Sequence, residues 1–206
     1  MSTILTGSHA ILDWAVASRP LAGERVSGDL HLVQPHANGV LVAVVDGLGH
    51  GEEAAVAASV AVAALMECAD QSVLAALRHC HERLKPTRGV VMSLAAFDAE
   101  NATMTWSGVG NVEGILIRAE AGVPHESILL RGGVIGYQLP PLQASLVSVH
   151  PGDTLIFVTD GVSDAFRTQV VAGQTPLQLA TSILNRFGKT TDDALVLVAR
   201  LQEGRT

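Results

Sequence analysis

One stretch constrains this 206-residue chain more than any other: an apolar run that ends abruptly in Asp46. The run, residues 39–45, reads Gly-Val-Leu-Val-Ala-Val-Val and is too short for a globular helix, so it predicts a strand buried on both faces. Residues 46–51 read Asp-Gly-Leu-Gly-His-Gly, and their glycines permit a sharp turn and a close approach of the backbone to a ligand. A carboxylate at a strand end beside bare carbonyl groups suits a hard cation. The glycines suit a plain tight turn equally well, and both interpretations stay open at this point.

The composition is typical of one domain that contains both helices and strands. The chain is long enough for one sizeable core and shows no break in composition, so we expect a single domain over residues 1–206. Hydrophobic residues make up 48% but aromatic residues only 3%, so Ala, Val, Leu and Ile must build the core. The net charge of −7 argues against a nucleic-acid-binding surface, because such surfaces need clustered Lys and Arg.

No segment is expected to enter or cross a membrane. The N-terminus lacks the basic region and the continuous apolar region of a signal peptide. The longest nearly unbroken apolar run, residues 54–66, has 13 residues, well short of the roughly 20 needed to span a bilayer. We therefore expect a cytoplasmic protein, in which Cys68 and Cys80 stay reduced and lie buried in helices.

Further strands are expected on the N-terminal side of the central run. Residues 9–18 predict one strand, and residues 30–33 predict a short one. A turn separates this short strand from residues 39–45, so the two should form a hairpin. Such a hairpin would bring Asp29 near Asp46.

The rest of the chain predicts two packed sheets with helices outside. Strands, two helices, a run of strands, two helices and a last strand follow one another, which indicates an α+β fold. The strands in the middle are separated by short polar turns and are expected to form an antiparallel meander. The expected helices cover residues 52–69, residues from Asp70 or Ser72 to Leu84, a helix capped by Ser163, and residues 176–187. The expected strands cover residues 89–97, 102–107, 112–118, 143–149, 154–159 and 194–201.

Carboxylates recur at the strand and loop edges. They belong to Asp29, Asp46, Asp160, Asp192 and Asp193. If these groups converge without a cation, they repel one another and raise their own pKa values, so convergence predicts a bound metal ion. Oxygen-only ligands favour magnesium or manganese over zinc. Taken singly, each carboxylate could instead merely solvate a strand end.

Four ordered segments resemble the signature blocks of the metal-dependent (PPM, type 2C) serine/threonine phosphatases. They are Ser27-Gly-Asp29, residues 46–51, Thr159-Asp-Gly-Val162 and residues 192–198, which read Asp-Asp-Ala-Leu-Val-Leu-Val. The first of them resembles the first acidic block of the bacterial SpoIIE-like branch, and the resemblance covers about residues 9–200. Gly108-Val-Gly-Asn111 stands where sensor-linked members have Ala-Gly-His-Asn. Together with the lack of a sensor domain, this difference most resembles the stressosome phosphatases of that branch.

The resemblance implies a four-layer α-β-β-α sandwich, in which helix pairs cover two central antiparallel sheets. It also implies two or more Mn²⁺ or Mg²⁺ ions. Asp46 would bridge two of them, and the carbonyl of Gly47 would bind one of the two. Asp160 and Asp192 would bind the other ion, while Asp29 would lie near a further or outer-shell site.

The roles of four positions do not follow directly from the pattern of the family. Asp193 falls where many relatives have Asn or a second Asp, so as a metal ligand it ranks behind Asp192. Leu48 stands where many eukaryotic relatives have a proton-donating His, and His50 is either the missing acid or a residue that shapes the loop. Arg25 is an approximate counterpart of the phosphate-contacting Arg of those relatives; the alternative is a solvated loop residue.

The implied reaction is hydrolysis of phosphoserine or phosphothreonine by a metal-activated water. The expected substrates are phosphorylated scaffold proteins of a stressosome-type signalling complex. Two alternatives stay open: a phosphatase of a phosphorylated anti-sigma-factor antagonist, and an inactive module that only binds phosphoproteins. The intact acids Asp46, Asp160 and Asp192 weigh against the inactive module.

Overall fold

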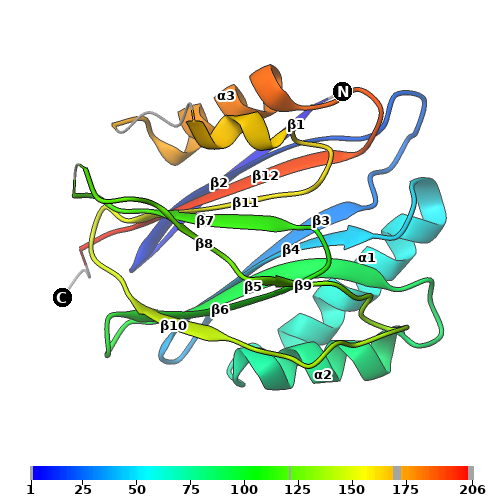
Figure 1. The fold of residues 1–206 in the computed structure, drawn as a ribbon, viewed down its shortest axis with the longest axis horizontal. Coiled ribbons are helices and arrows are strands. Elements are labelled where there is room, and N and C mark those ends of the chain that lie inside the picture. The colour runs from blue at the N-terminus through cyan, green and yellow to red at the C-terminus, as the bar shows by residue number, and fades with distance from the viewer. Residues whose placement is uncertain (1, 121, 169–172, 204–206) are drawn as a thin grey trace.

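The structure has four layers (Figure 1). The computed structural model describes residues 2–120, 122–168 and 173–203. Helix α3 (Pro176–Phe187) covers the outer face of one sheet, and helices α1 (Gly51–Glu67) and α2 (Val73–Leu84) cover the outer face of a second sheet. The two sheets pack on each other in the middle (Figure 1). The predicted α+β class and the α-β-β-α sandwich are therefore confirmed.

Two separate sheets, mainly antiparallel, make up the central layers. The sheet next to α1 and α2 runs in the order β10 (Ser145–Ser148), β6 (Thr103–Val109), β5 (Val90–Asp98), β4 (Gly39–Gly47) and β3 (Asp29–His36), and β9 (Leu130–Arg131) pairs in parallel with β6. The sheet next to α3 runs in the order β1 (Thr3–His9), β2 (Leu12–Arg19), β12 (Ala194–Leu201), β11 (Thr154–Val158), β7 (Glu113–Ile117) and β8 (Glu126–Ser127). The predicted hairpin is present as β3 and β4, and its register places Asp29 directly opposite Asp46.

The layered packing explains why the central strands are continuously apolar. In β4, the even-numbered residues 40–44 face the other sheet, and the odd-numbered residues 41–45 pack against α1 and α2. In β12, the odd-numbered residues 195–201 face the other sheet, and the even-numbered residues 194–198 pack toward α3. Both faces of these strands are buried, so neither strand shows the alternation of a half-exposed strand.

The helices begin at recognisable capping residues. At the start of α2, the Ser72 hydroxyl accepts a hydrogen bond from the amide of Ala75. Of the two predicted capping residues, Asp70 and Ser72, the helix therefore uses Ser72. Helix α3 begins with a capping box formed by Thr175 and Gln178. The expected helix after Ser163 is only a short 3-10 helix, η1 (Asp164–Thr168). Within the described part of the chain, no helix is both long and apolar enough to cross a membrane.

The predicted meander of three strands is wrong in its last member. β5 and β6 pair antiparallel as expected, but β7 lies in the other sheet beside β11. Burial is the physical reason, because Ile115 of β7 packs toward α3 while Leu116 faces the space between the sheets. The turn before β7 carries the chain from one sheet to the other, and Gly110 in this turn has a φ of +96°.

The single strand predicted over residues 9–18 is also incomplete. It corresponds to β2, and it pairs with a preceding strand, β1, that the sequence pattern does not reveal. Most residues of β1 are exposed because this strand lies at the edge of its sheet. An exposed edge strand needs no apolar face, so it leaves no periodic signal in the sequence.

Candidate metal centre

The predicted carboxylates meet where the two sheets come together at one end. Asp29 and Asp46 lie opposite each other in the β3–β4 hairpin. Asp160 follows the end of β11, and Asp192 and Asp193 precede the start of β12. β11 and β12 are antiparallel neighbours, so the end of one strand lies beside the start of the other. The antiparallel topology thus collects all five acids, although they are up to 164 positions apart in the sequence (193 − 29).

Two hydrogen-bonded side chains join the sheets at this end. The buried Thr159 hydroxyl donates to Oδ2 of Asp29 at 2.8 Å and accepts from the amide of Leu195 at 2.9 Å. Asp193 is 3% exposed, and its two carboxylate oxygens accept hydrogen bonds from the amides of Leu21 and Gly28, each at 2.7 Å. Both oxygens of Asp193 are therefore already engaged, which favours a positioning role for this residue over a metal-binding one. The sequence analysis named Thr159 only as the first residue of a signature block and assigned it no role.

Asp46 lies in a strongly perturbed electrostatic environment. Burial raises its pKa to about 8, and the neighbouring charges of Asp160, Asp192 and Asp193 add to this effect. Burial and the charge of Asp46 likewise raise the pKa of Asp29 well above its usual value. Among the described residues, no side chain or amide donates a hydrogen bond to the Asp46 carboxylate. A partly buried carboxylate with acidic neighbours and no protein donor is a suitable ligand for a cation.

Asp160 has two polar partners that the sequence analysis did not identify. Nδ2 of Asn111 donates to Oδ2 of Asp160 at 2.8 Å, and Nζ of Lys189 donates to the backbone carbonyl of Asp160 at 2.6 Å. Burial and the charge of Asp192 raise the pKa of Asp160, whereas Lys189 and Asn111 act in the opposite direction. Asn111 therefore orients the carboxylate of Asp160 through one of its two oxygens.

The glycines after Asp46 are required by the backbone itself. A Cβ on Gly47 would lie 2.2 Å from the carbonyl oxygen of Ala54, and Gly49 and Gly51 have φ values of +84° and +75°. The amide of Gly47 also donates to the carbonyl of Gly28 at 3.0 Å, which ties the loop to the neighbouring segment. The glycines therefore permit both the tight turn and the close packing of this loop against the start of α1.

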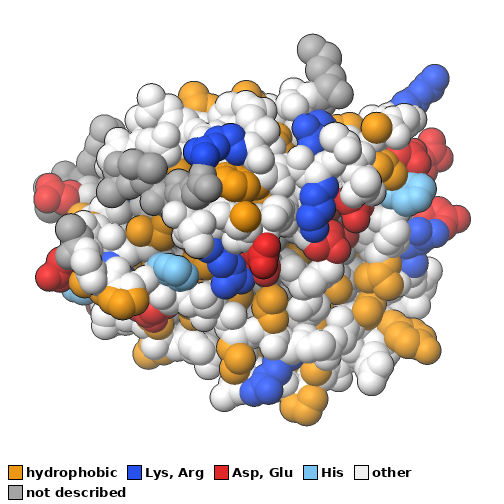
Figure 2. Space-filling model, turned by 45° about the horizontal axis from the view of Figure 1, so that its top comes forward, with side chains coloured by type: hydrophobic (Ala, Val, Ile, Leu, Met, Phe, Trp, Pro, Cys, Tyr) orange, Lys and Arg blue, Asp and Glu red, His pale blue; other side chains and the backbone are white. Residues whose placement is uncertain are grey.

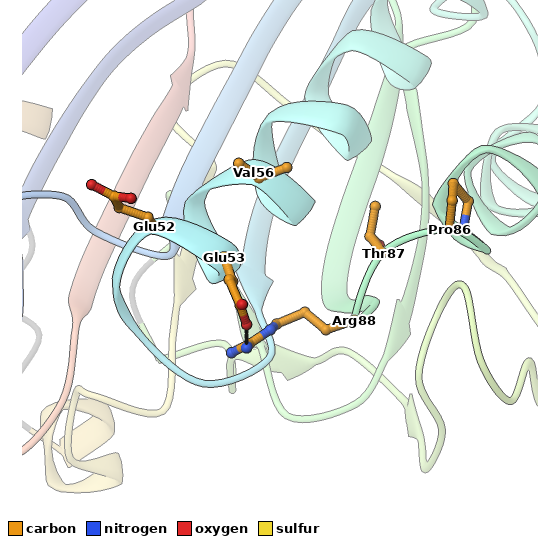
Figure 3. Close-up of a pocket in the computed structure, with 6 residues that line it drawn as sticks. All are labelled: Glu52, Glu53, Val56, Pro86, Thr87 and Arg88. Atoms are coloured by element: carbon orange, nitrogen blue, oxygen red, sulfur yellow. Dashed lines mark ion pairs between the residues drawn. The ribbon is translucent and has the colours of Figure 1, made fainter.

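A cavity of about 450 Å³ lies beside this loop (Figure 3). In Figure 3, the side chains of Glu53 and Arg88 point toward each other and form an ion pair, while Glu52 points away. Arg88 also donates to the carbonyl of Leu48 at 2.9 Å, so it holds the loop over residues 46–51 from outside. The lining residues are Glu52, Glu53, Val56, Pro86, Thr87 and Arg88.

The two residues of uncertain role, His50 and Arg25, lie differently from the acids. The side chain of His50 is 58% exposed, and its Nδ1 lies 2.8 Å from Oε1 of Glu24. Arg25 is exposed and has no hydrogen-bonding or ionic partner among the described residues. No contact ties either side chain to the carboxylates in the described part of the chain, so neither catalytic assignment gains support from the geometry.

The donor set fits a hard divalent cation. Asp46, Asp160, Asp192 and the carbonyl of Gly47 offer oxygen atoms only, the ligand type that magnesium and manganese prefer. Among the described residues, no three His, Cys, Asp or Glu side chains could hold a metal ion as they stand. Magnesium usually needs only one or two carboxylates, because water fills its remaining positions. The lack of a ready-made cage is therefore compatible with a water-rich metal site.

In Figure 2, basic and acidic side chains are interspersed, and no continuous basic stretch crosses this face. Phosphate-backbone binding needs clustered positive charge.

Comparison with known proteins identifies the family. A family model described as stage II sporulation protein E (SpoIIE) matches residues 36–202. The chain belongs to the SpoIIE family. The matched residues include every predicted metal ligand except Asp29.

Individual relatives agree with this family membership. The SpoIIE-family chain is 25% identical over 181 residues to the phosphoserine phosphatase RsbX of Bacillus subtilis (strain 168), covering 87% of this chain and 89% of that protein. It is 29% identical to a chain solved in work on the bacterial stressosome, with a TM-score of 0.84 and coverage of 92% of this chain and 99% of that one. A crystal structure of RsbX in complex with magnesium shares the fold, with a TM-score of 0.87, 21% identity and coverage of 97% and 100%.

A more distant structure carries the metal that the resemblance implied. The catalytic domain of the serine/threonine phosphatase PstP, in complex with two manganese ions, shares the fold at a TM-score of 0.70 and 18% identity. The comparison covers 98% of this chain and 100% of that chain.

We expect His50→Gln to slow the hydrolysis of a phosphoserine substrate and of an aryl phosphate by similar, small factors. His50 pairs with Glu24 on the exposed side of the loop, which indicates that it shapes the loop. Steady-state rates on the two substrates separate the roles, since an aryl oxide leaves without needing a proton. A loss of about 10²–10⁴-fold for phosphoserine alone, typical of general acid catalysis, would instead identify His50 as the acid. Glu24→Gln is the matched control, because it breaks the same pair from the other side.

Proposed function

We propose that this chain is a metal-dependent protein phosphatase that removes phosphate from serine or threonine on the scaffold proteins of a stressosome-type signalling complex. The observation that carries the proposal is the meeting of four carboxylates at one end of the two sheets, in a chain of the SpoIIE family. They belong to Asp29, Asp46, Asp160 and Asp192. Similarity to the phosphoserine phosphatase RsbX over 87% of the chain supports the phosphoserine specificity. Similarity to a chain solved in work on the bacterial stressosome supports the signalling context. The family match over residues 36–202 supports a single phosphatase domain within residues 1–206.

The side chains divide into those that hold metal and those that orient the holders. Asp46 and the carbonyl of Gly47 would hold one ion, and Asp46, Asp160 and Asp192 would hold a second. Bound magnesium or manganese supplies a nucleophilic water at neutral pH and neutralises phosphate charge.

The residues around these ligands fix their orientation. Asn111 holds one carboxylate oxygen of Asp160, and Thr159 holds one oxygen of Asp29. Asp193 fixes the loop that carries Asp29 through the amides of Leu21 and Gly28. Outer-shell partners of this kind contribute to metal affinity by restricting the ligand conformations.

The site is placed to accept a phosphate group carried by another protein. Asp46, Asp160 and Asp192 are partly exposed, whereas Asp29 and Asp193 are buried behind them. A cavity lies on the outer side of the loop, lined by residues from Glu52 to Val56 and from Pro86 to Arg88, and offers room for side chains that flank a phosphorylated residue (Figure 3). Such substrates are cytoplasmic signalling proteins, so we place the chain in the cytoplasm.

Purified protein with added manganese should dephosphorylate a phosphorylated stressosome scaffold faster than a phosphorylated anti-sigma-factor antagonist. The measurement is the initial rate of phosphate release from each phosphoprotein at equal concentration. Faster release from the antagonist would replace the proposed substrate with the alternative one. Binding of either phosphoprotein without any release would instead favour an inactive binding module.

A further inference from the structure

The segment before β12 fixes the backbone of Lys189 beside the metal centre. The amide of Lys189 donates to the carbonyl of Gly161 at 2.7 Å, and Nη2 of Arg19 donates to the carbonyl of Lys189 at 2.8 Å. An isolated bridge between Val162 and Gly188 adds a further link between the two turns. The Lys189 backbone is thus attached to the turn that presents Asp160.

The ammonium group of Lys189 reaches the centre itself. Its Nζ donates to the backbone carbonyl of Asp160 at 2.6 Å. Lys189 is exposed, and an ammonium group has three donors, so it can keep the Asp160 carbonyl and still donate to a ligand from solvent.

The charge balance of the site calls for such a cation. Five ionised carboxylates carry five negative charges, whereas two divalent ions carry four positive charges, so the centre keeps one excess negative charge. A phosphate monoester is itself negatively charged and would be repelled by this excess. A positively charged side chain at the rim would therefore favour phosphate binding.

The other candidate cations near the site are less well placed. Arg25 is exposed and contacts none of the acids among the described residues. Arg88 is engaged by Glu53 and by the carbonyl of Leu48 on the outer side of the loop. Lys189 is in direct contact with a residue that carries a candidate metal ligand.

We propose that Lys189 binds the phosphate group of the substrate and is the phosphate-contacting cation of this chain, in the role that Arg25 was expected to fill. The proposal rests on the proposed phosphatase function. Nζ of Lys189 donates to a phosphate oxygen while the Asp160 carbonyl and the Arg19 contact keep its position.

The chain offers a well-matched control, because Lys85 is its only other lysine. Lys85 lies at the end of α2 and pairs with Glu82. Lys85→Met and Lys189→Met change the net charge equally, so any difference between them reports the position of the charge. Lys189→Arg keeps the charge and tests whether a second cationic group can replace the ammonium.

Lys189→Met should weaken phosphate binding without weakening metal binding. We expect KM for a phosphoserine peptide and the inhibition constant of inorganic phosphate to rise about 10- to 100-fold, as for loss of a hydrogen bond to a charged group. The apparent affinity for manganese should stay the same or increase, because a repelling positive charge is removed. Lys189→Arg should retain most phosphate affinity, and Lys85→Met should behave as the wild type. A parallel fall in manganese affinity and thermal stability, or unchanged KM and phosphate inhibition, would overturn the assignment.

A second readout requires no turnover and separates this inference from the proposed function. Lysine labelled with ¹³C at Cε keeps the ammonium group with its three donors and gives two lysine signals, one for each position. In magnesium-loaded protein, inorganic phosphate should shift the Lys189 signal and leave that of Lys85 in place. If the protein hydrolyses no phosphoprotein but this shift occurs, the proposed substrate fails and the phosphate contact stands. If the protein is active and phosphate leaves Lys189 unshifted, the phosphate contact fails and the phosphatase function stands.

Discussion

Asp46→Asn should abolish phosphatase activity and, in metal-free protein, increase thermal stability. Activity should fall by more than about 100-fold, because even outer-shell partners of a metal contribute 10–100-fold and Asp46 is expected to bridge two ions. Stability should rise because partial burial and, to a smaller extent, the neighbouring carboxylates raise the pKa of Asp46 to about 8 and make its charge unfavourable near neutral pH. The amide removes this charge and leaves the side-chain volume nearly unchanged.

Two measurements check this prediction together: the rate of phosphate release, and thermal unfolding in the presence of chelator. Asp70→Asn is the matched control, since Asp70 is an exposed residue before α2 and lies outside the centre. Lower stability of metal-free Asp46→Asn would show that Asp46 is a structural residue at the end of a strand. Retained activity would remove Asp46 from the metal site.

Metal-free protein should lose stability as the pH rises from about 4 toward 8, and metal should restore it. Asp29, Asp46 and Asp160 have pKa values raised above the ordinary 3.8, to about 8 for Asp46. Between pH 3.8 and the raised pKa values, the folded state binds more protons than the unfolded state. The free energy of unfolding therefore falls as the pH increases. The stabilisation is therefore fully present near pH 4 and is lost as the pH passes through the raised values.

Divalent cations should reverse this trend, because they take the place of the protons on ionised carboxylates. Thermal unfolding between pH 5 and pH 8, with chelator or with manganese, should show a metal-induced rise that grows with pH and reaches roughly 5 °C or more at pH 8. Burial lowers the pKa of His31, which acts in the opposite direction below about pH 6.5, so the wild type is compared with Asp46→Asn. An equal pH slope in the two proteins would contradict the electrostatic account of the centre.

The sequence predicts the bounds of an element closely where burial or a capping residue leaves a clear pattern in it. The last strand and the helix over residues 176–187 have the predicted bounds, because one is buried on both faces and the other begins with a capping box. The partner of β7 could not be predicted, since the choice between sheets depends on which neighbours bury Ile115 and Leu116. Local pattern carries no information about that choice.

The candidate site shows the same division between local and long-range information. The acids stand out because each interrupts the chain beside an apolar strand, and the hairpin register of Asp29 and Asp46 follows from a local turn. The partners of these acids do not stand out. Asn111 reaches Asp160 from 49 positions away, and Thr159 reaches Asp29 across 130 positions. An asparagine or a threonine in a loop or at a strand end has many ordinary uses, so only the fold reveals these contacts.

The most direct test of the central claim is the metal dependence of phosphate release from a phosphoserine protein. Initial rates are measured on the same preparation with manganese, with magnesium and with excess chelator. The carboxylate centre predicts rapid release with either metal and a loss of at least about 100-fold in chelator, reversed when manganese is added back in excess. Release at an undiminished rate in excess chelator would contradict it.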